Sequence, residues 1–284
     1  MDQTALVTGA TDGHGQAVAE RLLSHGWEVH LHGRDEGRLQ ATAEALGASE
    51  GASDRVHTHR VDLASLDEVR ALADEISQLD RLDLLINNAG VGSGRPDERS
   101  RQESRDGIEL RFAVNYLASA LLTLRLLPLL RSSAPARVVM VSSLGQAPVD
   151  FGDAMLEAEY DGGRAYSQSK LAQIAFANEL AERVDPTEVT FTSLHPSTYM
   201  PTKIVLEEVG HSVDSLERGA DATVWLATDP ELQGVSGRFF DRQEESTPHP
   251  QAEDPESRRR LWQMTLDLTG EPEPQLPRRT PTAR

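Results

Sequence analysis

Short apolar or β-branched runs alternate along this chain with longer segments whose apolar residues repeat with helical period. The short runs lie at residues 5–8, 27–32, 56–61, 82–87, 137–142, 189–195 and 238–240. The clearest helical segments lie at residues 16–25, 66–79 and 165–184. Strands that alternate with helices pair in parallel through right-handed crossovers. The pattern therefore predicts an α/β fold, a single doubly wound parallel sheet of about seven strands with helices on both faces.

One domain accounts for most of the chain. The alternating pattern continues to about residue 270, so we expect residues 1–270 to form the sheet domain. Residues 271–284 are rich in proline and arginine and have no apolar period, which predicts a disordered tail. The chain has no cysteine, and this excludes disulfides, thiolate nucleophiles and zinc–thiolate sites.

The charge of the chain is strongly acidic. Its 28 basic and 46 acidic side chains give a formal net charge of −18, a sign that repels nucleic acids and anionic membrane surfaces. The first residues show no basic-then-apolar leader, and we see no apolar run of the roughly 18 residues that span a membrane. We therefore expect a cytoplasmic protein that binds neither nucleic acid nor membrane.

A glycine-rich turn, TGATDGHG at residues 8–15, joins the first predicted strand to the first predicted helix. A dinucleotide pyrophosphate needs glycines there for the tight turn, for close backbone approach and for helix packing. The N-terminus of the helix adds free N–H groups and the positive end of its dipole. The turn predicts a Rossmann-type dinucleotide site formed by Gly9, Thr11, Gly13, His14 and Gly15.

Two charged residues bear on the choice of dinucleotide. Arg34 follows the second predicted strand, where an acidic residue would hold the ribose 2′-hydroxyl of NAD and an arginine pairs with the 2′-phosphate of NADP. Asp12 in the glycine turn would oppose that phosphate. NADP(H) is favoured, with NAD(H) as the alternative. The competing interpretation of Arg34 is a helix cap or a partner of Asp35.

Two more strand ends face the predicted cofactor. Asp62 ends the third predicted strand, where its carboxylate is placed to accept a hydrogen bond from the adenine amino group. The segment 87–90, with Asn88, Ala89 and Gly90, ends the fourth strand and would form the floor beneath the dinucleotide.

Tyr166 and Lys170 form the clearest candidate for chemistry. Residues four apart share one face of a helix, so the ammonium can approach the phenol. A neighbouring ammonium favours the phenolate and would lower the pKa of Tyr166 from about 10 toward the working range. A serine at the end of the fifth strand, Ser142 or Ser143, would hold the substrate oxygen. Tyr199 and Lys203 have the same spacing, but Pro201 between them excludes the helical pairing.

Together these motifs resemble the short-chain dehydrogenases/reductases in their compact single-domain form, from about residue 4 to about residue 270. The segments RDGIELRFAVNY at 105–116 and RRLW at 259–262 are most similar to the retinol-dehydrogenase-like branch. The resemblance implies that Ser143, rather than Ser142, acts with Tyr166 and Lys170, and that Asn115 holds a water in a proton relay. It implies a cofactor held by the glycine turn, Arg34, Asp62, Leu63, Asn88, Ala89, Gly90, Tyr166, Lys170, Pro196 and Thr198.

The resemblance further implies an NADP-dependent oxidoreductase that moves hydride between the nicotinamide and the carbonyl or secondary-alcohol carbon of a small organic substrate, such as a lipid-like compound or secondary metabolite. Tyr166 would donate the proton, Ser143 would orient the oxygen, and Lys170 would tune the phenol and hold the nicotinamide ribose. An epimerase or lyase that uses transient oxidation, and a non-catalytic NADP-binding module, are the alternatives. Relatives pair through helices matching residues 117–129 and 166–184, so a homodimer or homotetramer is expected.

Metal binding is not expected. His30 and His32 share one face of a predicted strand, as do His57 and His59, but neither pair has an evident third ligand in the sequence.

Overall fold

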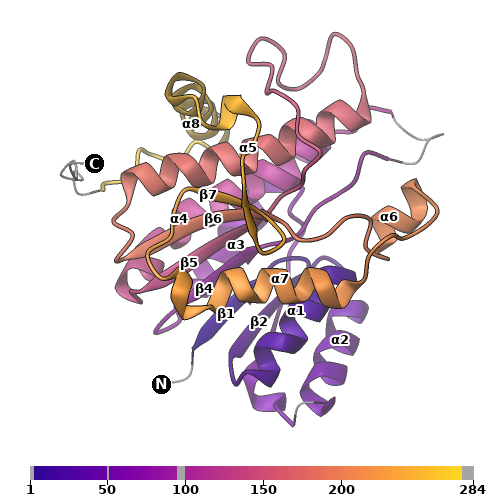
Figure 1. Ribbon diagram of the computed structural model, residues 1–284, viewed down its shortest axis with the longest axis vertical. Coiled ribbons are helices and arrows are strands. Elements are labelled where there is room, and N and C mark those ends of the chain that lie inside the picture. Colours follow the sequence, from indigo (N-terminus) through magenta and orange to yellow (C-terminus); the bar gives the residue numbers. More distant parts are fainter. Residues whose placement is uncertain (1–2, 50, 95–99, 277–284) are drawn as a thin grey trace.

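A twisted eight-stranded sheet forms the centre of the computed structural model, which describes residues 3–49, 51–94 and 100–276 (Figure 1). The strand order is β3-β2-β1-β4-β5-β6-β7-β8, and all neighbours pair in parallel except β7 with β8. The strands are β1 Thr4–Val7, β2 Glu28–Gly33, β3 Val56–Arg60, β4 Leu84–Asn87, β5 Ala136–Val141, β6 Val189–His195, β7 Arg238–Asp241 and β8 Glu244–Ser246. The strand order reverses at β1, whose neighbours are β2 and β4, and dinucleotides bind at the carboxyl ends of strands at such a reversal.

Helices cover both faces of this sheet, as expected. The α-helices are α1 Gly13–Ser24, α2 Glu36–Ser49, α3 Leu66–Ile76, α4 Ala118–Ser132, α5 Gly162–Arg183, α6 Lys203–Glu208, α7 Leu216–Thr228 and α8 Pro255–Thr269. A π-helical segment, Phe112–Leu117, leads into α4, and short 3-10 turns lie at Ser53–Arg55, Pro230–Leu232 and Pro250–Ala252. Figure 1 shows α1, α2 and α7 on one face of the sheet and α3, α4 and α5 on the other.

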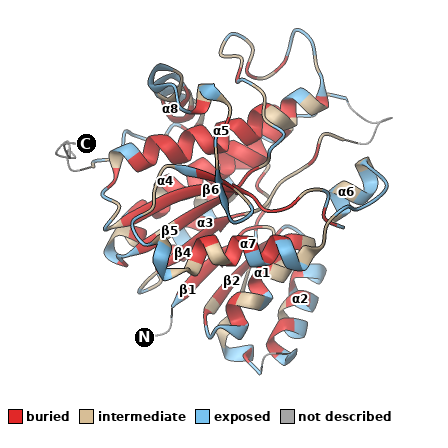
Figure 2. Ribbon diagram, viewed as in Figure 1, coloured by how far each residue is buried: buried red, intermediate tan, exposed pale blue. Residues whose placement is uncertain are grey.

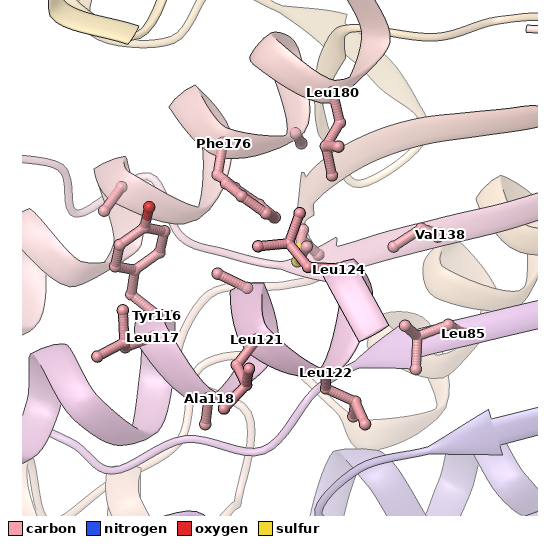
Figure 3. Packing of buried hydrophobic residues seen from close by; sticks show 14 of the residues in the cluster. Leu85, Tyr116, Leu117, Ala118, Leu121, Leu122, Leu124, Val138, Phe176 and Leu180 are labelled. Carbon is pink, nitrogen blue, oxygen red and sulfur yellow. The ribbon is translucent and has the colours of Figure 1, made fainter. Parts of the chain in front are cut away.

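Each face of the sheet has its own apolar core, and buried residues concentrate on the strands and on the helix faces toward them (Figure 2). Val7 and Leu31 of the strands pack with Leu22 of α1 on one side. On the other side Leu121 of α4 and Phe176 of α5 belong to the larger core, and Figure 3 shows their side chains between the helices and the strands. The strands of this doubly wound sheet are buried on both faces, and for this reason they appear in the sequence as continuous apolar runs.

The apolar segment Phe112–Ser132 is long and apolar enough to cross a membrane by length and composition, but 83% of its most apolar window is buried inside the fold. The sequence was expected to contain no apolar run of the roughly 18 residues that span a membrane, so this segment corrects that expectation. In the structure Pro128 lies inside α4, and Arg125 pairs with Asp74 and Glu271 at the helix surface. The segment is the central helix of the larger core.

The strand count corrects the expectation of seven. β8 is an eighth strand that pairs antiparallel with β7 at the edge of the sheet. Its residues, Glu-Glu-Ser, are polar and number only three, so they carry no alternating apolar pattern from which a strand can be predicted.

The first residues of the expected disordered tail contact the domain. Glu271 pairs with Arg125 at 3.1 Å, and Glu273 pairs with Arg183 at 2.7 Å and accepts a hydrogen bond from the Trp262 indole at 2.8 Å. Residues 271–276 therefore lie against the domain. Residues 277–284 lie outside the described part of the chain.

α8 packs on α5, the helix through which relatives were expected to pair. The rings of Trp262 on α8 and Phe176 on α5 stack with centroids 5.8 Å apart. The Arg183 guanidinium at the end of α5 lies 4.0 Å from the centroid of the Trp262 ring. Part of the α5 surface is thus covered within the chain itself.

Candidate active site

The glycine turn is shaped by contacts that no larger residue would permit. Gly9 has a φ of +66°, and a Cβ there would lie 2.8 Å from the Ala89 backbone. A Cβ on Gly15 would lie 2.2 Å from the Gly9 carbonyl oxygen. Asp12, at the N-cap of α1, makes no side-chain capping bond. The first N–H groups of α1 are therefore left for an anion, and the turn fits a dinucleotide pyrophosphate.

His14 and Asn88 hold this turn in place rather than pointing outward. His14 Nδ1 lies 2.8 Å from Asn88 Oδ1, and its Nε2 lies 3.0 Å from Thr223 Oγ1 on α7. The Asn88 side-chain amide donates to the Thr8 and Gly9 carbonyl oxygens at 2.8 and 3.1 Å. Burial lowers the pKa of His14, so its neutral form is favoured. His14 and Asn88 were predicted to contact the cofactor, and in the structure they fix the backbone of the glycine turn.

Two arginines, Arg34 and Arg38, follow β2, and Arg38 pairs with Asp12. Arg34 is exposed, and it makes no ion pair with any other described residue. Asp35 is not its partner but caps α2, since its carboxylate accepts from the Arg38 backbone N–H at 2.9 Å. Arg38, which the sequence reasoning missed, binds the Asp12 carboxylate at 2.6 Å. Asp12 thus has a cationic partner in the structure, and Arg34 has none among the described residues. Arg38 follows Arg34 by four residues, and this spacing could have indicated from the sequence that a second arginine lies near the same site.

Asp62 and Leu63 lie at the end of β3, as expected. The Asp62 carboxylate accepts from the Ala64 backbone N–H at 3.0 Å, and its other oxygen lies 3.5 Å from Arg105. Its own backbone N–H donates to Glu68 at 2.7 Å, while Leu63 is buried. The Asp62 carboxylate is only partly exposed, and the oxygen that accepts from Ala64 stabilises the turn after β3.

Ser143 and Tyr166 meet at the end of β5. A Cβ on Gly145 would lie 3.4 Å from the Ser143 Oγ and 4.0 Å from the Tyr166 ring, so the two side chains are neighbours. The Ser143 Oγ accepts from the Gly145 backbone N–H at 3.0 Å. Ser142 instead donates to the Lys170 carbonyl oxygen at 2.7 Å, away from the phenol. The structure therefore brings Ser143, not Ser142, to the tyrosine.

The pKa of Tyr166 is shifted upward, opposite to the direction expected. Burial is the main cause, the Glu208 carboxylate adds to it, and the hydrogen bond from Ser143 opposes it. The ammonium of Lys170 lies 5.7 Å from the centroid of the phenol ring and donates to the Val141 carbonyl oxygen at 2.8 Å and to Gln173 at 3.1 Å. Burial lowers the pKa of Lys170 to about 8. In this arrangement the phenol is kept protonated, and the lysine is held by the end of β5.

Asn115 lies in the π-helical segment before α4, a type of distortion that is frequent at functional sites. Its side-chain amide donates to the Val91 carbonyl at 3.1 Å and to Ser169 at 2.9 Å, and its oxygen accepts from the Val91 N–H at 2.7 Å. A Cβ on Gly90 would contact both Asn115 and the Lys170 Nζ. Asn115 thus joins the segment after β4, at Val91, to Ser169 of α5, next to Lys170.

The segment after β6 lies next to the glycine turn. Thr198 Oγ1 lies 3.0 Å from His195 Nε2, and Ser197 donates to Asp214. A Cβ on Gly13 would lie 3.2 Å from the Thr202 side chain, so the segment that follows Pro196 and Thr198 reaches the phosphate turn. Tyr199 is 48% exposed, and α6 begins only at Lys203. As predicted from Pro201, this second tyrosine and lysine share no helix.

Glu208 at the end of α6 is a residue that the sequence reasoning missed. Its carboxylate accepts from the backbone N–H groups of Ser93 and Gly94 at 3.0 and 2.8 Å and from the Ser93 hydroxyl at 2.6 Å. These contacts join α6 to the loop after β4, next to Tyr166. No motif marks the residue, because its partners are backbone groups more than a hundred residues away.

A Rossmann-type sheet with a glycine turn and a joined Ser143, Tyr166 and Lys170 set defines a nucleotide-dependent dehydrogenase. The short chain dehydrogenase family model matches residues 3–209, and the chain belongs to this family. It is 37% identical to retinol dehydrogenase 14 of Mus musculus over 94% of this chain and 86% of that protein. It is 39% identical to polyprenol dehydrogenase of Mus musculus over 94% of this chain and 84% of that protein.

A solved structure of an uncharacterized protein from Mycobacterium paratuberculosis superposes with a TM-score of 0.78 at 26% identity, over 96% of this chain and 95% of that one. These relatives confirm the fold class and the resemblance to the retinol-dehydrogenase-like branch. The chain is an oxidoreductase of the NAD(P)-binding type that acts by hydride transfer.

Proposed function

We propose that the protein is an NADP-dependent dehydrogenase/reductase that acts on the carbonyl or alcohol carbon of an apolar organic molecule in the cytoplasm. The observation that carries this proposal is the placement of Ser143 and Tyr166 as neighbours at the end of β5, with the buried ammonium of Lys170 5.7 Å from the centroid of the phenol ring. Neither an NADP-binding module nor a structural protein requires this arrangement.

The side chains divide the proton chemistry between them. The nicotinamide dinucleotide, when bound at the glycine turn, supplies or accepts the hydride. The Tyr166 hydroxyl, kept protonated by its raised pKa, donates its proton to the substrate oxygen in reduction. The Ser143 hydroxyl holds that oxygen and stabilises the charge that develops on it. The Lys170 ammonium supplies positive charge at the same strand end, which favours the phenolate left after proton transfer.

The preference for NADP rests on the arginines after β2. Arg34 is exposed and unpaired among the described side chains, and Arg38 neutralises the carboxylate of Asp12 that would otherwise repel a 2′-phosphate. Charge-assisted contacts of this kind contribute about 1.5–3 kcal/mol.

The apolar nature of the substrate rests on exposed side chains near the site. Leu144, next to Ser143, is 47% exposed. Ile204 on α6 is 36% exposed and lies against the loop after β4, where a Cβ on Gly92 would be 2.5 Å from it. Exposed apolar groups gathered beside a reactive tyrosine are suited to an apolar ligand. Retinol dehydrogenase and polyprenol dehydrogenase, by their names, also act on apolar alcohols.

The test is a substrate screen that follows the absorbance of NADPH, with Tyr166→Phe as the decisive variant. We expect this variant to bind NADPH nearly as well as the wild type and to lose turnover by orders of magnitude, because only the proton donor is removed. Tyr199→Phe is the matched control and should retain turnover. Turnover of Tyr166→Phe within a few-fold of the wild type would contradict the assignment. Product formation without net NADPH consumption would favour the epimerase or lyase instead.

A further inference from the structure

Four histidines of β2 and β3 lie on the face of the sheet toward α3, and they extend from His32, which accepts a hydrogen bond from Gly9 of the glycine turn at 3.1 Å, back toward the start of β2. In the parallel register His30 of β2 lies opposite His57 of β3, and His32 lies opposite His59. Side chains two apart share one face of a strand, so all four imidazoles project from the same face. Glu28, the first residue of β2, projects beside them. The register thus brings together two pairs that the sequence left without a third ligand.

Three ligand atoms converge at the start of β2. The Glu28 carboxylate oxygen lies 2.8 Å from His57 Nε2 and 3.6 Å from His30 Nε2, and the three atoms lie within 4.8 Å of one another. His30 is only 3% exposed. Both nitrogens are buried, and neither makes a hydrogen bond of acceptable geometry with any residue that the structure describes. Buried imidazole nitrogens without partners are rare, because desolvation of such a group costs about 1–3 kcal/mol.

A chain of contacts orients His30. His59 Nδ1 lies 3.0 Å from the Glu75 carboxylate on α3, although not in hydrogen-bond geometry. His59 Nε2 and His30 Nδ1 lie 2.8 Å apart and share one hydrogen bond. This bond orients the His30 ring, whose other nitrogen, Nε2, lies 3.6 Å from Glu28. Contacts from neighbouring side chains fix metal-binding imidazoles in the same way.

The buried Nε2 of His30 lacks a hydrogen-bond partner among the described residues, and a bound cation would supply a partner. A divalent ion contacts all three atoms at once, and the net charge of −18 favours its approach.

The distances match a small transition-metal ion. Ligand bonds of about 2.0–2.1 Å in a tetrahedron place the ligand atoms roughly 3.3 Å apart. The pair of Glu28 and His30 is already near this separation. The rings of His30 and His57 stack with centroids 4.6 Å apart, so the partly exposed His57 side chain has to rotate for its Nε2 to point at the same ion. We propose that Glu28, His30 and His57 bind one divalent transition-metal ion of the zinc type, with water as the fourth ligand.

The role of such an ion is structural. It would link the edge strand β3 to β2, while the contact from Glu75 through His59 extends the link to α3. Tyr166 and Lys170 lie on α5 at the end of β5, and β1 and β4 separate β5 from β2, so the ion would not take part in hydride transfer. A ligand that binds only the folded chain stabilises it by mass action.

The test is calorimetric titration of the full chain, without an affinity tag, with Zn²⁺ alone. We expect one equivalent to bind and to raise the midpoint of thermal unfolding. His57→Gln and Glu28→Gln should each weaken binding by about tenfold or more, and Glu75→Gln by a smaller factor because it acts through His59. His211→Gln, an exposed histidine outside the cluster, is the matched control and should bind like the wild type.

A second probe removes dependence on the folding of any variant. Co²⁺ added to the wild-type chain should give the visible absorption of a tetrahedral nitrogen and oxygen site, and Zn²⁺ should displace it. The proposal is overturned if the wild type shows no saturable one-to-one binding. It is also overturned if folded His57→Gln and Glu28→Gln bind Zn²⁺ as tightly as the wild type and His211→Gln.

Discussion

Replacement of Lys170 by methionine should stabilise the protein near neutral pH while removing its activity. The ammonium is buried, and its pKa falls from 10.5 to about 8 on folding. Such a shift corresponds to about 3 kcal/mol of unfavourable free energy for the charged form. The ammonium recovers part of this cost through hydrogen bonds to Val141 and Gln173, each of which contributes about 1 kcal/mol. Lys170→Met should therefore be more stable than the wild type by about 1 kcal/mol at pH 7.

The sign of this difference should reverse with pH. The folded pKa lies below the unfolded one, so the unfolded state binds more protons between about pH 8 and 10.5, and wild-type stability rises through that window. The burial cost is fully present below about pH 8 and disappears above 10.5. At high pH only the lost hydrogen bonds remain, and Lys170→Met should then be less stable by about 2 kcal/mol.

The assay is urea unfolding of both proteins without cofactor, at several pH values between about 7 and 10.5. Lys203→Met is the control, because that lysine is 60% exposed and makes only a 3.9 Å contact with Glu207. Its stability should follow the wild type at every pH. A difference between Lys170→Met and the wild type that stays constant with pH would refute the reasoning.

Three further perturbations test other parts of the site. Arg34→Asp should weaken NADPH relative to NADH by roughly tenfold or more in binding titrations, and a wild type with no preference for NADPH would contradict the role of Arg34. Gly15→Ala should lose dinucleotide binding and lower the free energy of unfolding by about 1–3 kcal/mol, since its Cβ would lie 2.2 Å from the Gly9 oxygen; Gly37→Ala, whose Cβ meets no atom closer than 3.6 Å, should not. Glu208→Gln should move the rising limb of alcohol oxidation to lower pH, because the carboxylate raises the pKa of Tyr166; an unchanged pH profile would show that α6 does not lie against the tyrosine during turnover.

The sequence reasoning succeeded where local pattern and order along the chain determine the structure. Strands buried on both faces leave continuous apolar runs, so the parallel strands were found with bounds close to those observed. Pro201 was enough to reject Tyr199 and Lys203, since a proline excludes the helical geometry that the pair requires. The strand β8 was missed because three polar residues at a sheet edge produce no periodic signal.

The reasoning failed where contacts join distant parts of the chain. Glu208 acts on Tyr166 through space, and nothing in their spacing indicates it. Burial raises the pKa of Tyr166, and this effect does not show in a sequence, where only the neighbouring charges that lower the pKa can be predicted. The histidine cluster depends on strand register, since a slip of one residue would send His57 to the other face of the sheet. Register is fixed by the whole sheet and not by the pairs themselves.

The near absence of lysine makes amine chemistry a selective probe of this protein. Lys170 and Lys203 are the only side-chain amines in the sequence, because arginine supplies all other positive side chains apart from histidine. Lys203 is 60% exposed and should be acylated by any amine-reactive reagent, whereas Lys170 is 5% exposed and shielded at the end of β5. Its pKa of about 8 nevertheless leaves a large unprotonated fraction at mildly basic pH. Mass spectrometry of two peptides would therefore report separately on the protein surface and on how often the active site opens.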